Sequence, residues 1–154
     1  MARLRTLPRI VIDTREQLPY EFAGYDTVVR KLDAGDYSLE GHEHAVAVER
    51  KSKQDAYGCV GSGRDRFVRC LDRLGAMDRT CVVIECSLAD FAQPPSHTKI
   101  TAAQAVGSYV GWSMRYRIPV YWCWDDPVRR ITARQFAERV TLRYLASYAK
   151  MINE

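Results

Sequence analysis

Residues 35–55 read GDYSLEGHEHAVAVERKSKQD, and the run AVAVERK within them predicts a central strand of a sheet. Side chains on a strand alternate between two faces, and both faces here stay uncharged until the last three residues. Such a run is typical of a strand covered on both sides, where charged groups are costly unless they are paired or bind a metal. The charged end, Glu49, Arg50 and Lys51, therefore needs partners.

A second acidic residue, Asp36, lies upstream of this strand and follows Gly35, which permits a close turn. The stretch around Tyr37 and Leu39 alternates apolar with polar residues, so we expect it to return antiparallel beside the later strand. In that arrangement Asp36 and Glu49 converge at one edge of the strand pair.

The chemistry of these residues is that of a magnesium-dependent phosphodiesterase. Glu49 and Lys51 share a strand face with Ala45 and Ala47, whose small side chains leave room for a bound group. Two carboxylates suit Mg²⁺, which keeps waters that a phosphate oxygen can displace, and a lysine beside them orients a water or stabilises developing charge. A Glu-x-Lys pattern alone is also common as a surface pair at a strand end. The surrounding sequence must therefore distinguish a catalytic pair from a surface pair.

Four elements in a fixed order extend the pattern: IDTRE at 12–16, GDY at 35–37, ERK at 49–51 and Asp55. The set closely resembles the XPF-type nuclease domain, a family of structure-specific endonucleases with a GD...ERKxxxD signature. The resemblance continues through later segments and covers roughly residues 9–150. Those segments are RFVRCLDRL at 66–74, CVVIEC at 81–86 and YRIPVYWC at 116–123.

The resemblance implies roles for the residues of the matched motifs. Asp36 and Glu49 would hold a magnesium ion, for which manganese would substitute, and Asp13 would join them as a ligand. Lys51 would act in catalysis. The other motif residues would line or brace the site: Asp13, Glu16, Arg50 and Asp55.

Five arginines between positions 64 and 79 favour contact with nucleic acid more than the formal net charge of +4 does. On a helix, Arg66, Arg69 and Arg73 share one face, and a guanidinium fork donates two parallel hydrogen bonds to phosphate. Interleaved aspartates leave the alternative of a merely solvated helix face. The DNA contacts that we expect are Arg15, Arg64, Arg66, Arg69 and Arg73.

The order of elements indicates a mixed sheet covered on both faces, with a first part that runs as a meander and a second part that alternates with helices. This matches the restriction-endonuclease-like architecture of the resembled family, a three-layer α/β/α fold with a mixed central sheet. The patterns predict strands at about 9–13, 27–31, 36–40, 45–50, 81–86 and 119–124, and helices at about 53–74, 102–116 and 133–150.

Local signals refine the helices. Thr101 with Gln104 and Thr132 with Gln135 each form a capping box, which predicts two helix starts. Glycines 58, 61 and 63 interrupt the helix expected at 53–74, and we expect a mobile hinge there.

Aromatic residues cluster near the end of the chain. Strand alternation and the flanking Pro119 favour burial of Tyr121, Trp122 and Trp124 over stacking on bases. The last helix carries a stripe from Phe136 to Tyr148 that is either core packing or a self-association surface. The loop at 17–22 either approaches DNA or packs on the sheet edge; its sequence favours neither.

The length of 154 residues with 47% hydrophobic composition predicts a single domain over 1–154. Cellular members of the resembled family usually add a tandem helix-hairpin-helix region, and the sequence to Glu154 holds none, so we expect the short stand-alone form seen in bacteria or phages. The resemblance also implies a homodimer, and a protein partner that supplies substrate specificity stays possible.

The remaining composition narrows the class of protein. Five cysteines without a C-x-x-C pattern predict neither a disulfide framework nor a zinc site. No apolar stretch reaches the ~20 residues that cross a bilayer, and the N-terminus lacks a signal-type region. We therefore expect no membrane partner and a cytoplasmic location in a bacterial or phage-infected cell.

The function that these features predict is a Mg²⁺-dependent DNA endonuclease that acts on branched, flapped or nicked DNA during repair or recombination. A catalytically inactive DNA-binding or scaffolding module of the same fold is the main alternative, although its usual mark, loss of an acid or of the lysine, is missing. A small-molecule α/β enzyme also fits the fold but lacks a nucleotide-binding motif.

Overall fold

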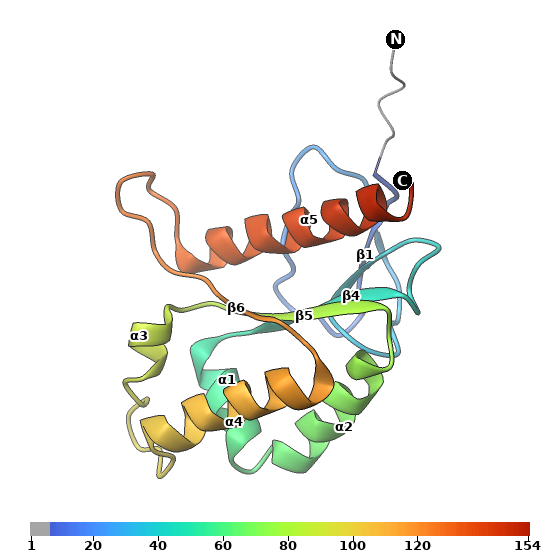
Figure 1. Ribbon diagram of the computed structural model, residues 1–154. Helices are drawn as coiled ribbons and strands as arrows, with labels where there is room; N and C mark the ends of the chain where they lie inside the picture. Colours follow the sequence, from blue (N-terminus) through green and yellow to red (C-terminus); the bar gives the residue numbers. More distant parts are fainter. Residues whose placement is uncertain (1–6) are drawn as a thin grey trace.

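The computed structural model describes residues 7–154, and its centre is one six-stranded mixed sheet (Figure 1). The strands lie in the order β2-β1-β3-β4-β5-β6. The pairs β1–β3 and β3–β4 are antiparallel, and the pairs β1–β2, β4–β5 and β5–β6 are parallel. The strands are β1 (Ile10–Ile12), β2 (Thr27–Val29), β3 (Tyr37–Leu39), β4 (Val46–Lys51), β5 (Arg79–Ile84) and β6 (Val120–Trp122).

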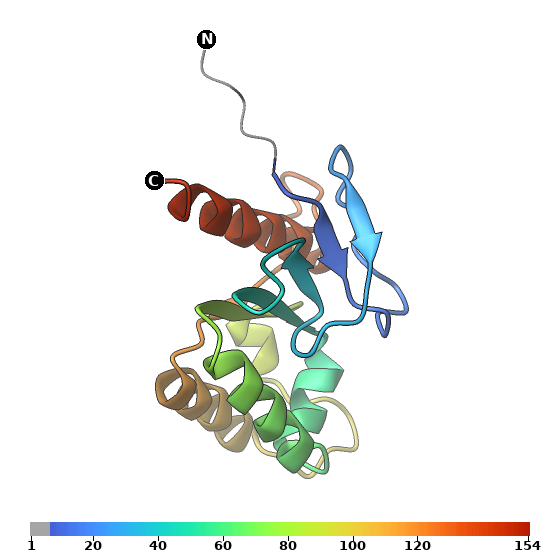
Figure 2. The same cartoon turned by 90° about the vertical axis from the view of Figure 1, so that its right-hand side faces the viewer.

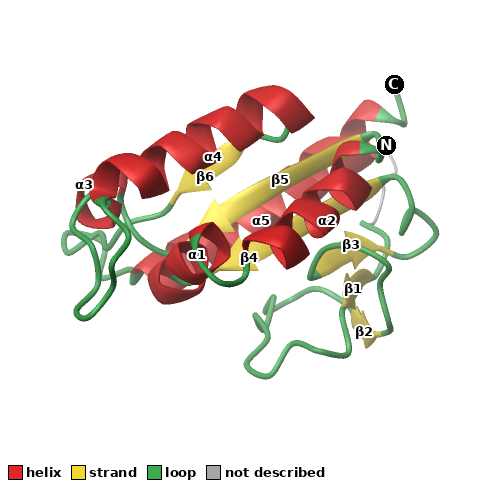
Figure 3. Ribbon diagram, turned by 90° about the horizontal axis from the view of Figure 1, so that it is seen from below, coloured by secondary structure: helices red, strands yellow, loops and turns green. Residues whose placement is uncertain are grey.

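Helices cover both faces of the sheet, which confirms the three-layer α/β/α fold. The helices α1, α2 and α4 lie on one face and α5 crosses the other, as the view in Figure 2 shows (see also Figure 3). Within residues 7–154, no helix is both long and apolar enough to span a membrane. The helices are α1 (Lys53–Val60), α2 (Arg64–Gly75), α3 (Leu88–Phe91), α4 (Ala102–Tyr116) and α5 (Ala133–Met151).

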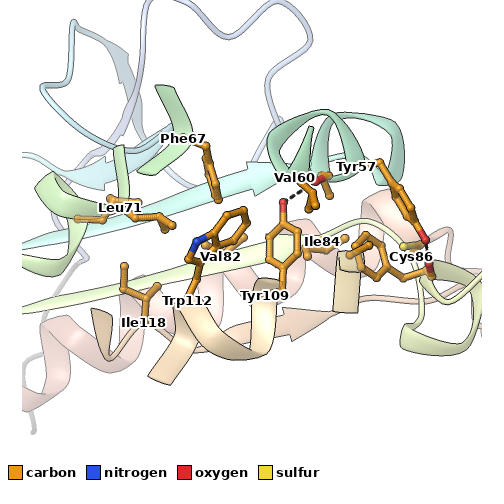
Figure 4. Close-up of a cluster of buried hydrophobic side chains, with 14 of the residues drawn as sticks. Tyr57, Val60, Phe67, Leu71, Val82, Ile84, Cys86, Tyr109, Trp112 and Ile118 are labelled. Atoms are coloured by element: carbon orange, nitrogen blue, oxygen red, sulfur yellow. Dashed lines mark hydrogen bonds between the residues drawn. The ribbon is translucent and has the colours of Figure 1, made fainter. Parts of the chain in front are cut away.

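The two faces of the sheet carry two separate hydrophobic clusters, because side chains alternate along each strand. On β5, Val82 and Ile84 face the layer of α1, α2 and α4, whereas Cys81 and Val83 face α5. Figure 4 shows the first cluster, in which aromatic side chains from α2 and α4 pack over β5. This packing fixes α2 against the end of β4, where the catalytic residues were expected.

The meander expected for the first strands is wrong at β2. The strand β2 pairs parallel with β1 at the edge of the sheet, and β3 takes the place between β1 and β4. The reason is burial: all three residues of β3 are buried, whereas Thr27 and Val29 of β2 are exposed and Val28 is only half-buried. An edge position suits so short and exposed a strand.

The helix signals were accurate where they rested on capping and glycine. Both predicted capping boxes are present, at Thr101 and at Thr132. The helix expected at 53–74 is two helices, and the amide of Gly63 donates to the carbonyl of Gly58 across the break. The short helix α3 was not predicted; its start is capped by Ser87, whose side chain accepts from the amide of Asp90.

The expected burial of the aromatic run is wrong for two of its members. Tyr121 and Trp124 are 40% and 49% exposed, and only Trp122 packs against the cluster beneath α4. The strand β6 is an edge strand, and the helices on its two faces leave its outer side chains partly open. Position in the sheet, which the local sequence does not encode, decides their exposure.

We predict that Gly35→Ala destabilises the fold by about 2 to 4 kcal/mol, because two penalties add. Gly35 has a φ of +81°, which side chains rarely adopt, and a Cβ there would lie 2.7 Å from the Cβ of Ala47. Gly41→Ala is the matched control, since Gly41 has a φ of +86° but no atom within 4 Å of the place that a Cβ would take. Chemical denaturation should show the larger loss for Gly35; equal losses would contradict the close contact.

Candidate active site

The pairing of β3 with β4 brings Asp36 and Glu49 to one place, as the sequence predicted. The amide of Asp36 donates to the carbonyl of Val48 at 2.9 Å, and Oδ2 of Asp36 accepts from the amide of Arg50 at 2.8 Å. Both carboxylates line a cavity of about 780 Å³. The register of two short strands therefore sets the position of the acids.

Lys51 and Cys70 contact the two oxygens of the Glu49 carboxylate. The Nζ atom of Lys51 lies 3.4 Å from Oε1, and the thiol of Cys70 donates to Oε2 at 3.8 Å. Glu49 itself is only 7% exposed. The ammonium of Lys51 also lies 4.9 Å from the ring centre of Phe67, which limits its freedom to swing away from the cavity.

Burial and mutual repulsion shift the charges of this cluster. Burial and the nearby Glu49 raise the pKa of Asp36 well above its ordinary value. Burial likewise raises the pKa of Glu49, against the attraction of Lys51. Burial disfavours the ammonium of Lys51, but Glu49, Asp36 and the nearby thiols together outweigh it and raise that pKa. Two acids that repel each other in a cavity are stabilised by any cation that enters between them.

The donor set suits a hard cation that keeps its own water. Within residues 7–154, no three side chains of histidine, cysteine, aspartate or glutamate are grouped so as to hold a metal ion. Mg²⁺ is usually held by one or two carboxylates together with waters and substrate phosphate, so Asp36 and Glu49 meet its requirements.

Asp13 does not lie open as a metal ligand, contrary to the role expected of it. Its Oδ1 accepts from the amide of Leu32 at 2.8 Å, and its Oδ2 accepts from Nε of Arg15 at 2.7 Å. Although burial works against it, these bonds lower the pKa of Asp13. The carboxylate is 1% exposed in the wall of the same cavity, where these bonds brace the turn after β1 and orient Arg15.

Glu16 and Arg50 brace the site from the opposite side of β4. Oε2 of Glu16 accepts from the hydroxyl of Tyr37 at 2.6 Å and from Nη1 of Arg50 at 3.0 Å. Nε of Arg50 donates to Oε1 of Glu85 at 3.1 Å, and its guanidinium lies 4.7 Å from the ring centre of Tyr20. Arg50 thus anchors the end of β4 while its two neighbours face the cavity.

Glu85 was missed by the sequence reasoning, although a signal for it exists. It follows the buried run of β5 directly, just as Glu49 stands at the end of an apolar run on β4. A charged residue in that position needs a partner. The structure provides Arg50 on the adjacent strand as that partner.

The loop after β1 packs on the protein, which answers the question that its sequence left open. Tyr20 and Phe22 are buried. The guanidinium of Arg134 on α5 donates to the carbonyl of Leu18, and Glu138 accepts from the amide of Phe22 at 2.9 Å. The helix α5 therefore holds the segment that carries Glu16.

Asp55 lies at the cavity as expected, in the first turn of α1. Its amide donates to the hydroxyl of Ser52, which caps the helix. The carboxylate is exposed and lines the cavity mouth, so it contributes negative charge there without a structural bond of its own in the described residues.

Only three of the five expected DNA contacts line the cavity: Arg15, Arg66 and Arg73. Arg69 is exposed outside it. Arg64 is committed elsewhere, because Nη1 donates to Ser108 at 3.0 Å and its guanidinium lies 4.9 Å from the ring centre of Trp112. The basic face of α2 is therefore shorter than the sequence suggested.

Solved structures share the fold of this chain. The chain superimposes on XPF from Aeropyrum pernix with a TM-score of 0.59 and 19% identity, covering 74% of this chain and 52% of that one. It superimposes on XPF from Aeropyrum pernix in complex with DNA with a TM-score of 0.69 and 18% identity, covering 93% of this chain and 66% of that one. The chain thus spans about half to two thirds of the length of these proteins. No curated protein sequence matches it.

The mixed sheet between helical layers is a restriction-endonuclease-like fold, which this chain shares with XPF. The family model for the ERCC4 domain matches residues 12–128. The chain belongs to the ERCC4 domain family. The matched residues include every acid and base of the cavity described above.

We predict that Asp36→Asn stabilises the metal-free protein at neutral pH. A carboxyl whose pKa is raised in the folded state binds its proton more tightly there than when unfolded, so wild-type stability falls as pH rises above the ordinary value of 3.8. The variant keeps an oxygen for the amide of Arg50 and escapes this loss. Denaturation in a chelating buffer should show its advantage at pH 7 shrinking toward pH 4; an advantage that grows on acidification would contradict the raised pKa.

Proposed function

We propose that this protein is a metal-dependent DNA endonuclease that hydrolyses phosphodiester bonds in branched, flapped or nicked DNA. One observation carries the proposal: the half-buried Asp36 and the buried Glu49 repel each other in one cavity, with Lys51 at 3.4 Å from Glu49. Membership of the ERCC4 domain family supports it. We place the activity in DNA repair or recombination, in the cytoplasm of a bacterial or phage-infected cell.

Asp36 and Glu49 would hold Mg²⁺, with Mn²⁺ as a substitute. When bound, such an ion polarises the phosphate and acidifies a water. Lys51 orients the attacking water or stabilises the charge that develops on the phosphate, because its ammonium is held against Glu49 and stays protonated. Arg50 keeps this end of β4 in place from the other face.

DNA would lie across the cavity mouth. Arg15 is oriented by Asp13 and remains 65% exposed, and Arg66 and Arg73 line the same cavity from α2. These basic groups beside the acids would hold backbone phosphates next to the scissile bond. XPF from Aeropyrum pernix, which shares this fold, has been solved in complex with DNA, and this supports DNA as the partner.

We predict that Glu49→Gln and Lys51→Ala each lower cleavage by at least about 100-fold, while folding and DNA binding stay nearly intact. The assay is cleavage of labelled junctions, flaps and nicked duplexes with Mg²⁺. Lys53→Ala is the matched control, since Lys53 pairs with Asp90 outside the cavity.

Cleavage by Glu49→Gln in metal-replete buffer would contradict the assignment. Calorimetric titration with Mg²⁺ separates a nuclease from an inactive DNA-binding module, because the latter has no reason to keep a divalent cation site.

The protein also forms a homodimer in this proposal, through the apolar surfaces of its last two helices. Phe136, Val140 and Tyr144 are half-buried and line a groove of about 640 Å³ between α5 and β6, so the stripe on α5 is not simply core. On α4, Val110 and Met114 are 61% and 80% exposed. Apolar surface on both sides of an edge strand is typical of an association face.

We expect sedimentation at micromolar concentration to give twice the chain mass of 17.6 kDa. Val140→Glu places a charge in the groove and should yield monomers. Val29→Glu, on the exposed edge strand β2 across the sheet, should leave the dimer unchanged. A monomeric wild type would count against the dimer without touching the nuclease assignment.

A further inference from the structure

The groove between α5 and β6 combines apolar surface with positive charge. It has a volume of about 640 Å³, and apolar and aromatic side chains of α5 line it from Phe136 to Met151. Arginines join this lining from three directions: the start of β5, the loop after β6, and two positions on α5. They are Arg79, Arg129, Arg139 and Arg143.

The protein itself does not neutralise this charge. Arg139 and Arg143 lie one turn apart on α5, both are exposed, and neither forms a hydrogen bond or an ion pair in the described part of the chain. Among the described residues that line the groove, Asp126 is the one acid. Its carboxylate is already used, because it lies 3.7 Å from Nε of Arg129 and accepts from the amide of Val128 at 3.1 Å.

We propose that this groove docks a partner protein through an acidic segment that carries apolar side chains on one face. The apolar side chains would displace water from the groove, and carboxylates accept paired hydrogen bonds from guanidinium groups. The lining along α5 runs from Phe136 to Met151, about 22 Å at 1.5 Å per residue, which matches a helix of about four turns. An amphipathic helix in an apolar groove is a general mode of recognition. This inference goes beyond the nuclease function and does not depend on it.

A second copy of the chain is one rival occupant, because the groove is part of the surface proposed for the homodimer. A symmetric dimer that brings two such grooves together sets four arginines against four more. The acid of each lining is already bonded and cannot pair with them. A partner with its own carboxylates satisfies the charge that a second copy leaves unpaired, so the two would compete for the groove.

Single-stranded DNA is the other rival occupant, since arginines and aromatic rings together also bind nucleotides. The aromatic rings of this groove are engaged with neighbouring rings. The ring centre of Tyr144 lies 6.3 Å from that of Tyr121, and the ring centre of Phe136 lies 4.6 Å from that of Trp124. Rings covered in this way offer little area on which bases could stack, which favours the apolar side chains of a protein.

The experiment measures the binding of fluorescein-labelled peptides of about 15 residues to the full chain by fluorescence anisotropy, without metal or DNA. The first peptide is an amphipathic helix of leucine and glutamate. The second has lysine in place of glutamate, and the third has alanine in place of leucine. We expect the first to bind at least about 10-fold more tightly than either of the others, and to bind more weakly as the salt concentration rises.

Two charge reversals locate the binding site. Arg143→Glu should weaken binding of the first peptide at least about 10-fold, because it removes an attraction and adds a repulsion inside the groove. Arg115→Glu is the matched control, since Arg115 is also an exposed helical arginine but lies on α4, outside the groove. It should leave the affinity unchanged, and circular dichroism establishes that both variants fold.

Equal affinity of the two variants for the first peptide would overturn the proposal, and so would a wild type without saturable binding. Tighter binding of oligothymidine than of the peptide, lost in Arg143→Glu, would assign the groove to nucleic acid instead. A dimeric wild type that excludes the peptide would assign it to the second copy. Since the readout involves no cleavage, failure of the docking site and failure of the nuclease proposal are separate results.

Discussion

The close approach of β3 to β4 at Gly35 is the constraint on which the site depends. Gly35 has a positive φ, and a Cβ at this position would lie 2.7 Å from the Cβ of Ala47, so only glycine fits. The next residue, Asp36, then donates its amide to the carbonyl of Val48. This close packing places Asp36 beside Glu49. Backbone packing, rather than attraction between side chains, assembles the acids, because their own interaction is repulsive.

Because side chains alternate along β4, neighbouring residues at its end make different contacts. Glu49 and Lys51 pair with each other in the cavity, whereas Arg50 between them reaches the cavity edge and is held by Glu16 and Glu85. A partly buried guanidinium with two carboxylate partners cannot easily leave. Arg50 thus limits the movement of the two residues beside it on β4, and it connects them to α5 through the loop after β1.

Predictions from the sequence were correct where the signal was local. They failed where the tertiary fold decides which neighbours a side chain contacts. The strand at 46–51, the antiparallel return through Tyr37 and both capping boxes follow from alternation and short-range hydrogen bonding. The edge position of β2 and the role of Asp13 depend on which neighbours the fold supplies. Asp13 has the residue type of a metal ligand, yet Arg15 and the amide of Leu32 take up its oxygens.

Removing two acids from water costs free energy, which the hydrophobic cluster next to them offsets. Each carboxylate loses solvation, and of the two only Glu49 forms a salt bridge with Lys51. The offset comes from apolar burial next to the site, where Phe67, Tyr109 and Trp112 pack α2 and α4 onto β5 (Figure 4). A loosely packed α2 would let water reach Glu49 and relax the repulsion that favours a cation, so the density of this cluster serves the site as well as the fold.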